Sequence, residues 1–139
     1  MSSEQRVVLV TGVGGNVGQG ILRIIRSSFP EIRLIATDVG RVTAGHHFCD
    51  AFYQVPYAYD SGFRAAFLQI PGLEKVDLII PSTDYEALYL SSFASELPAV
   101  IASSPKCIRT CLDKWTTWTV LSSAGVPFAE SCLPSQYDG

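Results

Sequence analysis

A glycine-rich loop near the N-terminus is the first segment whose residues could take part in chemistry. Residues 11–18 read TGVGGNVG, after an apolar β-branched run and before a segment with helical spacing. Glycines let the backbone turn tightly into a helix, and the first N–H groups of that helix have no partner and can bind an anion. We therefore predict a substrate- or anion-binding loop that contains Gly12, Gly14, Gly15 and Asn16.

Asp38 follows the second apolar run, at the spacing from the loop where a dinucleotide-binding fold places its ribose-binding carboxylate. The loop also has the spacing TGxxGxxG of short-chain dehydrogenases and epimerases, which makes NAD(P) binding one interpretation. The other interpretation is that the glycines serve only the strand-to-helix turn. Short-chain dehydrogenases use a tyrosine with a lysine four residues later, and none of the five internal tyrosines, from Tyr53 to Tyr89, has one. An NAD(P)-binding domain therefore stays as the alternative function.

A second polar group follows the apolar run VDLII at residues 76–80. It consists of Ser82, Thr83, Asp84 and Glu86. Open α/β sheets bind ligands beyond the carboxyl ends of their strands, so we predict that these residues contact a substrate. Thr83 or Asp84 is also placed to cap the helix that comes next, and for Asp84 capping is the slightly favoured role.

Strand-like and helix-like segments alternate along the chain, which predicts βαβ units and a parallel sheet. We predict a three-layer α/β sandwich, a Rossmann-like fold with about five strands in the order 3-2-1-4-5. The helix after the third strand has a plausible cap at Asp60 or Ser61 and should end at Pro71. Expected strands are 6–11, 32–37, 51–55, 76–80 and 99–102; expected helices are 17–28, 60–70, 84–95, 105–112 and 113–124.

Composition narrows the function classes. Hydrophobic residues make up 47% of the 139 residues, charged residues make up 17%, and the net charge is -3. No basic cluster points to nucleic acid, and no apolar run has the ~20 residues that a membrane span needs. The polar N-terminus does not resemble a signal peptide, and four cysteines without a CxxC pair suggest free thiols. We therefore expect a cytoplasmic protein.

One group of side chains has metal-ligating types: His46, His47, Cys49 and Asp50. Adjacent histidines in an extended loop tend to point apart, and no second ligand group lies at a standard spacing. We therefore predict no metal site in this chain.

The second half of the chain carries motifs that identify a family. A buried strand ends in IPSTDYE, a helix begins at SSP, and DKW is followed by a helix and AGVP. This order resembles the pre-ATP-grasp domain of carbamoyl-phosphate-synthase-like ATP-grasp ligases. The VTGVGGNVG, ATD and CDAFYQVP segments also have counterparts in that family, so the resemblance covers nearly the whole chain.

The resemblance implies that two domains of the parent enzyme carry out different parts of the reaction. This domain, expected over residues 1–125, would shape the site of a small-molecule acceptor, and residues 126–139 would lead toward a missing ATP-grasp domain. That domain would hold ATP and Mg²⁺ and phosphorylate a carboxylate, and an amine or thiol would attack the acyl phosphate. Lys114 matches the position from which a basic residue reaches ATP in relatives such as biotin carboxylase; the alternative is a solvated lysine beside Asp113. The fragment alone should have no complete active site, and a homodimer is left open.

Overall fold

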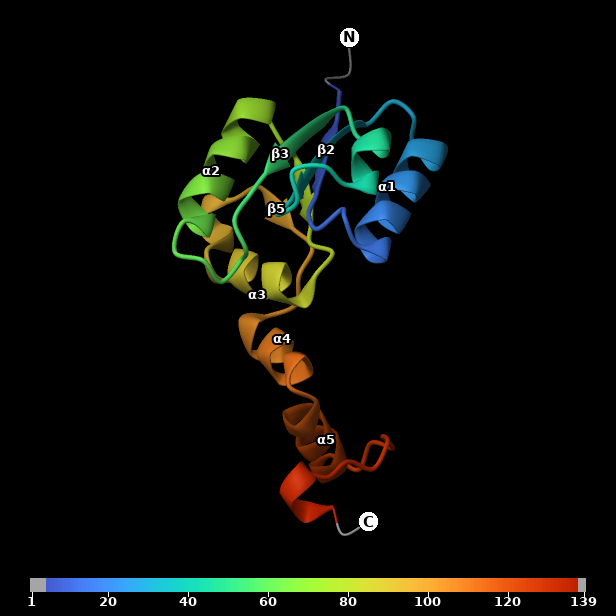
Figure 1. Cartoon of the computed structure of the whole chain (residues 1–139), viewed down its shortest axis with the longest axis vertical. Helices are drawn as coiled ribbons and strands as arrows, with labels where there is room; N and C mark the ends of the chain where they lie inside the picture. The colour runs from blue at the N-terminus through green and yellow to red at the C-terminus, as the bar shows by residue number, and fades with distance from the viewer. Residues whose placement is uncertain (1–4, 138–139) are drawn as a thin grey trace. The chain divides into compact units, whose positions relative to one another are not determined.

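A computed structural model describes residues 5–137 (Figure 1). The chain divides into two compact units, residues 1–102 and residues 103–139. The first unit contains the sheet, and the second contains helices. The expected division into a domain of residues 1–125 and a linker of residues 126–139 stays a prediction.

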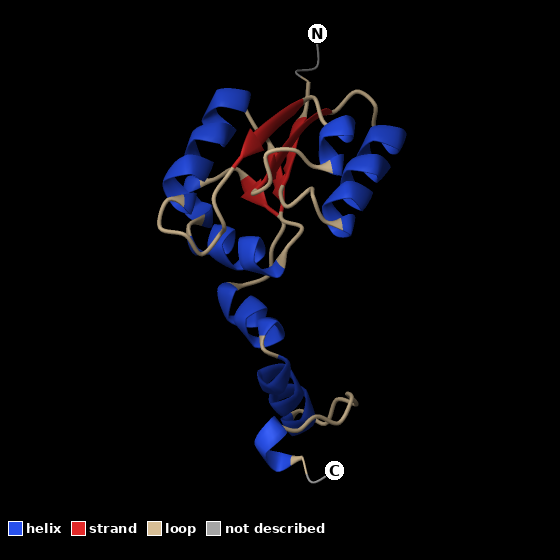
Figure 2. Ribbon diagram, viewed as in Figure 1, coloured by secondary structure: helices blue, strands red, loops and turns tan. Residues whose placement is uncertain are grey.

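The first unit is built on a parallel sheet of five strands, drawn as red arrows in Figure 2. Its order is β3-β2-β1-β4-β5, and each neighbouring pair is parallel. This confirms the predicted topology. The strands are β1 Val7–Val10, β2 Arg33–Asp38, β3 Ala51–Gln54, β4 Leu78–Ile80 and β5 Ala99–Val100.

Helices cover both faces of the sheet, as the predicted three-layer sandwich requires (Figure 1). One face carries α1 Asn16–Ser28, with the short 3₁₀ helix η1 Ala44–Phe48 beside it. The other face carries α2 Phe63–Glu74 and α3 Asp84–Ser92, and the 3₁₀ helix η2 Ala94–Glu96 follows α3 in the chain.

The two faces bury separate apolar cores, because successive side chains of a strand point to opposite sides. Leu9 and Ile35 pack with Phe63 and Phe67 in the first core, under α2. The second core, under α1, contains Val8, Val10, Val13, Leu22, Leu34 and Ala36.

The second unit contains α4 Pro105–Leu112, α5 Lys114–Ser123 and the 3₁₀ helix η3 Pro134–Gln136. Ser104 caps α4 by accepting a hydrogen bond from the Cys107 N–H at 3.3 Å. Asp113 caps α5 by accepting one from the Thr116 N–H at 2.6 Å. Both helix starts therefore lie where the sequence predicts them. Among the helices within residues 5–137, none combines the length and apolar character needed to traverse a bilayer.

Helix α2 departs from the prediction at both ends. It begins at Phe63 after Gly62, and no side chain caps it, so the predicted cap at Asp60 or Ser61 is wrong. Pro71 lies inside the helix, which continues to Glu74. A proline costs a helix one N–H hydrogen bond, but Pro71 is buried, and its carbonyl accepts the Val76 N–H at 3.0 Å. These contacts keep the last turn helical.

Candidate functional site

The predicted site segments meet at the carboxyl edge of the sheet. The glycine loop follows β1, Asp38 ends β2, and Ser82 and Thr83 follow β4. They surround a cavity of about 370 Å³. Of the predicted site residues, it is lined by Gly12, Gly14, Gly15, Asp38, Thr83 and Glu86; the other lining residues are Val39, Tyr57, Ala58, Tyr59 and Tyr85.

Asp38 is a buried carboxylate that holds two loops together. Its Oδ2 accepts a hydrogen bond from the Gly14 N–H at 2.7 Å, and its Oδ1 accepts one from the Gly40 N–H at 2.8 Å. The side chain therefore fixes the glycine loop against the segment after β2. Gly14 leaves room for this contact, because a Cβ there would lie 3.0 Å from Asp38 Oδ2.

Glu86 joins the two loops on either side of the cavity. Its Oε2 accepts hydrogen bonds from the Thr11 hydroxyl at 2.8 Å and from the Thr83 hydroxyl at 2.7 Å. The Thr11 hydroxyl in turn accepts the Ser82 N–H at 3.3 Å, and the Ser82 hydroxyl donates to the Gly12 carbonyl at 3.1 Å. The glycine loop and the start of α3 thus form one hydrogen-bonded unit.

Thr83, not Asp84, is the N-cap of α3. Its hydroxyl accepts a hydrogen bond from the Glu86 N–H at 3.2 Å. Asp84 is the first helical residue and is exposed, so the capping role predicted for Asp84 is wrong. An extended backbone at Thr83 places its side chain over the free N–H groups of the first turn. The sequence offered Thr83 and Asp84 as neighbouring cap candidates and could not show which of them has this backbone geometry.

Burial raises the pKa of Glu86 above its ordinary value. The hydrogen bonds from Thr83 and Thr11 oppose this shift, and the negative charge of Asp38 adds to it. A raised pKa means that the folded protein disfavours the charged carboxylate at this position.

Replacing Glu86 with glutamine is therefore expected to raise the free energy of unfolding at neutral pH, because glutamine keeps the shape of the side chain without the buried charge. The pKa of Glu86 is higher in the folded protein than in the unfolded chain. The protonated carboxyl therefore contributes its full stability below the pKa of the unfolded chain, and this contribution is lost as the pH rises through the pKa of the folded protein. The difference between variant and wild type should shrink on acidification. Urea unfolding at neutral and acidic pH measures it, with the exposed Glu31→Gln as control. A variant less stable than wild type at neutral pH would contradict this account.

Three tyrosines at the cavity were not among the predicted site residues. The rings of Tyr57 and Tyr59 stack with centroids 5.2 Å apart, and Tyr85 meets Tyr59 edge-on at 6.1 Å. Each side chain is more than half exposed. The alternation in Tyr57-Ala-Tyr59 could have indicated that both rings share one side of an extended segment, but only the fold brings Tyr85 beside them.

The remaining predicted residues lie outside the cavity lining. Asn16 is the first residue of α1 and is exposed. Ser82 contacts the site through the Gly12 carbonyl. Lys114 belongs to the second unit, where its Nζ donates to the Cys111 carbonyl at 3.0 Å. Its role toward ATP stays a prediction.

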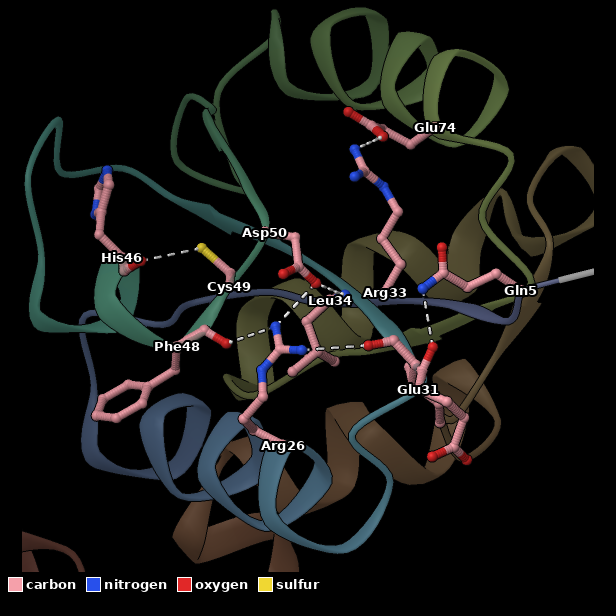
Figure 3. A network of polar contacts seen from close by, with 11 residues as sticks. Gln5, Arg26, Glu31, Arg33, Leu34, His46, Phe48, Cys49, Asp50 and Glu74 are labelled. Atoms are coloured by element: carbon pink, nitrogen blue, oxygen red, sulfur yellow. Dashed lines mark hydrogen bonds and ion pairs between the residues drawn. The ribbon is translucent and has the colours of Figure 1, made fainter.

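Three members of the group with metal-ligating side-chain types, His46, Cys49 and Asp50, make structural contacts (Figure 3). Asp50 Oδ2 pairs with Arg26 at 2.8 Å and accepts the Leu34 N–H at 2.8 Å. The Cys49 thiol donates to the His46 carbonyl at 3.6 Å, and the His46 ring points away from that sulfur. Within residues 5–137, no three His, Cys, Asp or Glu side chains come together as a metal site.

Solved structures with a similar fold include a synthetase and a transformylase. N5-carboxyaminoimidazole synthetase from Staphylococcus aureus superimposes on this chain with a TM-score of 0.67 and 19% sequence identity. The match covers 86% of this chain and 30% of the synthetase chain. Glycinamide-RNase-transformylase T from Mycobacterium tuberculosis has a TM-score of 0.68 at 13% identity, over 90% of this chain and 37% of its own. This chain therefore spans about a third of the length of these relatives. No curated protein sequence matches it.

The sequence also matches a protein family directly. Residues 8–100 match the family described as PylC-like, N-terminal domain. This match and the shared fold confirm the predicted N-terminal, pre-ATP-grasp domain and do not favour the NAD(P)-binding alternative. Because the matched residues make up most of the chain, the protein belongs to the family of PylC-like N-terminal domains.

Proposed function

We propose that the chain is the acceptor-side domain of an ATP-dependent ligase. The parent enzyme would phosphorylate a carboxylate, and an amine or thiol would then displace phosphate from the acyl phosphate. The family match supports this proposal, as do relatives such as the S. aureus synthetase, which has also been solved with ADP, and a bacterial biotin carboxylase domain. The observation that carries it is the cavity at the carboxyl edge of the sheet, which residues of both predicted loops line.

The residues of this cavity suit an acceptor better than ATP. Of the side chains that line it, Asp38 and Glu86 are acidic and the rest are uncharged, so a triphosphate would meet negative charge. Residues 5–137 also gather no metal-ligating cluster. We therefore assign ATP and Mg²⁺ to the C-terminal ATP-grasp domain of the parent. In that assembly Lys114 would supply a positive charge toward the phosphates.

We place the parent enzyme in the cytoplasm. Four free cysteines, Cys49, Cys107, Cys111 and Cys132, fit a reducing compartment.

The test compares the parent enzyme with the 139-residue chain. The parent is expected to release ADP only when a carboxylate substrate and an amine or thiol are both present, and mass spectrometry should find the ligated product. The chain alone should release none, because its cavity is lined by acidic side chains and ATP is assigned to the C-terminal ATP-grasp domain. Oxidation or reduction of a nicotinamide cofactor by the parent, without ADP release, would contradict the proposal.

A further inference from the structure

We infer that the group entering this cavity is a cation of the ammonium type, held by the free oxygen of Glu86 and by the tyrosine cluster Tyr57, Tyr59 and Tyr85. The inference rests on the proposed function and names the chemical class of its acceptor. The sequence predicts that the glycine loop binds a substrate or an anion. A cationic ligand would leave the substrate role and exclude a phosphate-bearing group. Four features of the site support the inference.

One carboxylate oxygen of Glu86 has no hydrogen-bond partner among residues 5–137. Its Oε2 accepts two hydroxyl hydrogen bonds, whereas its Oε1 accepts none from residues 5–137. The residue is only 7% exposed. Within residues 5–137, the one fully buried side-chain polar atom without a partner is Thr37 Oγ1, so Glu86 Oε1 is not sealed off from solvent. Since Glu86 lines the cavity, that oxygen is available to a hydrogen-bond donor there.

The charges around the cavity have one sign. Asp38 and Glu86 are its charged lining residues, and none of the eleven residues described as its lining is a lysine, arginine or histidine that could balance them. Two carboxylates at one small site attract a cation and repel a phosphate or a second carboxylate.

Three N–H groups of the glycine loop are already hydrogen-bonded within the protein. The Val13 N–H donates to the Thr37 carbonyl at 3.3 Å, and the Gly15 N–H donates to the Gly12 carbonyl at 3.1 Å. The Gly14 N–H is held by Asp38 at 2.7 Å. A phosphate that used these three N–H groups would have to displace internal hydrogen bonds and approach the Asp38 carboxylate. The loop therefore serves as a wall of the cavity.

The tyrosine cluster supplies the second half of a cation site. The face of an aromatic ring is negative and attracts ammonium groups, most strongly where water is partly excluded. Tyr59 lies between the other two rings, stacked on Tyr57 and edge-on to Tyr85, and all three line the cavity that Glu86 lines. An ammonium group could thus contact the carboxylate while its carbon chain lies on the rings.

The test uses n-butylammonium and n-butyl phosphate, which share a carbon chain and differ in charge. Each is titrated into the ¹⁵N-labelled 139-residue chain, and the amide resonances of Gly12, Gly14 and Ala58 are followed by NMR. Butylammonium is expected to shift them to saturation, and butyl phosphate is expected to leave them in place. Glu86→Gln should weaken butylammonium binding by about tenfold or more, and Glu31→Gln, an exposed control, should not change it.

Tyr59→Leu provides an independent variant, since this ring is 57% exposed and its loss should leave the fold intact. It should weaken butylammonium binding by about threefold or more. Binding of butyl phosphate at these resonances, absence of butylammonium binding, or unchanged affinity in both variants would overturn the inference. The titration contains no ATP and measures no turnover, so its failure is distinguishable from failure of the ligase proposal.

Discussion

Replacing Gly12 with alanine is expected to lower the free energy of unfolding by about 2–4 kcal/mol, as the sum of two costs. Gly12 has φ +61°, in the left-handed region that a residue with a Cβ enters only at a cost. A Cβ would also lie 2.7 Å from Ser82 Oγ and 2.8 Å from both Glu86 Oε2 and Thr83 Cγ2. These atoms belong to the hydrogen-bonded unit between the two loops and cannot withdraw without breaking it.

Urea unfolding of the 139-residue chain measures this effect. Gly20→Ala is the matched control, because Gly20 lies in the interior of α1 and a Cβ there meets no atom within 4 Å. The control should be neutral or stabilising by up to about 1 kcal/mol, since alanine favours a helix over glycine. Equal stability of the two variants would contradict the left-handed backbone conformation and the close side-chain neighbours described for Gly12.

Replacing Phe67 with alanine is expected to cost about 3–5 kcal/mol, the range typical of an aromatic side chain deleted from a core. Phe67 is fully buried on the inner face of α2, and its ring centroid lies 5.4 Å from that of Phe63. Deleting the ring would leave a void between α2 and the sheet, which the fixed β1 and β2 backbones cannot fill.

The same unfolding assay tests the core prediction. Leu73→Ala is the control on the same helix, because Leu73 is 72% exposed and its loss should change stability by less than about 0.5 kcal/mol. Phe67→Ala should unfold at much lower urea than Leu73→Ala. Similar midpoints would mean that α2 does not pack on the sheet as described.

The sheet could be predicted from the sequence because its signals are local and its connections are constrained. Short β-branched runs such as Val7–Val10 alternate with amphipathic segments, and right-handed βαβ crossovers leave few strand orders. The same rule predicted that Asp38 and the residues after β4 would share one edge. Pro71 was misjudged because burial and an accepted hydrogen bond outweigh the local cost of a proline in the last turn.

The details of the site depend on tertiary contacts that no local pattern contains. The glycine loop predicts free N–H groups, yet Thr37 and Asp38, from a different strand, occupy two of them. Glu86 was predicted at the site, but its link to Thr11 joins residues far apart in the sequence. The tyrosine cluster likewise forms only when the segment after β3 folds beside the start of α3.

The account's central claim is that the cavity at the carboxyl edge holds the acceptor and that ATP binds elsewhere in the parent ligase. Steady-state kinetics of the parent test this claim, with ATP and the acceptor varied separately for wild type, Tyr59→Ala and the control Tyr137→Ala, whose ring is exposed in the second unit. Tyr59→Ala should raise the KM for the acceptor by about threefold to tenfold and leave the KM for ATP unchanged, while Tyr137→Ala changes neither. A raised KM for ATP with an unchanged KM for the acceptor would contradict the claim.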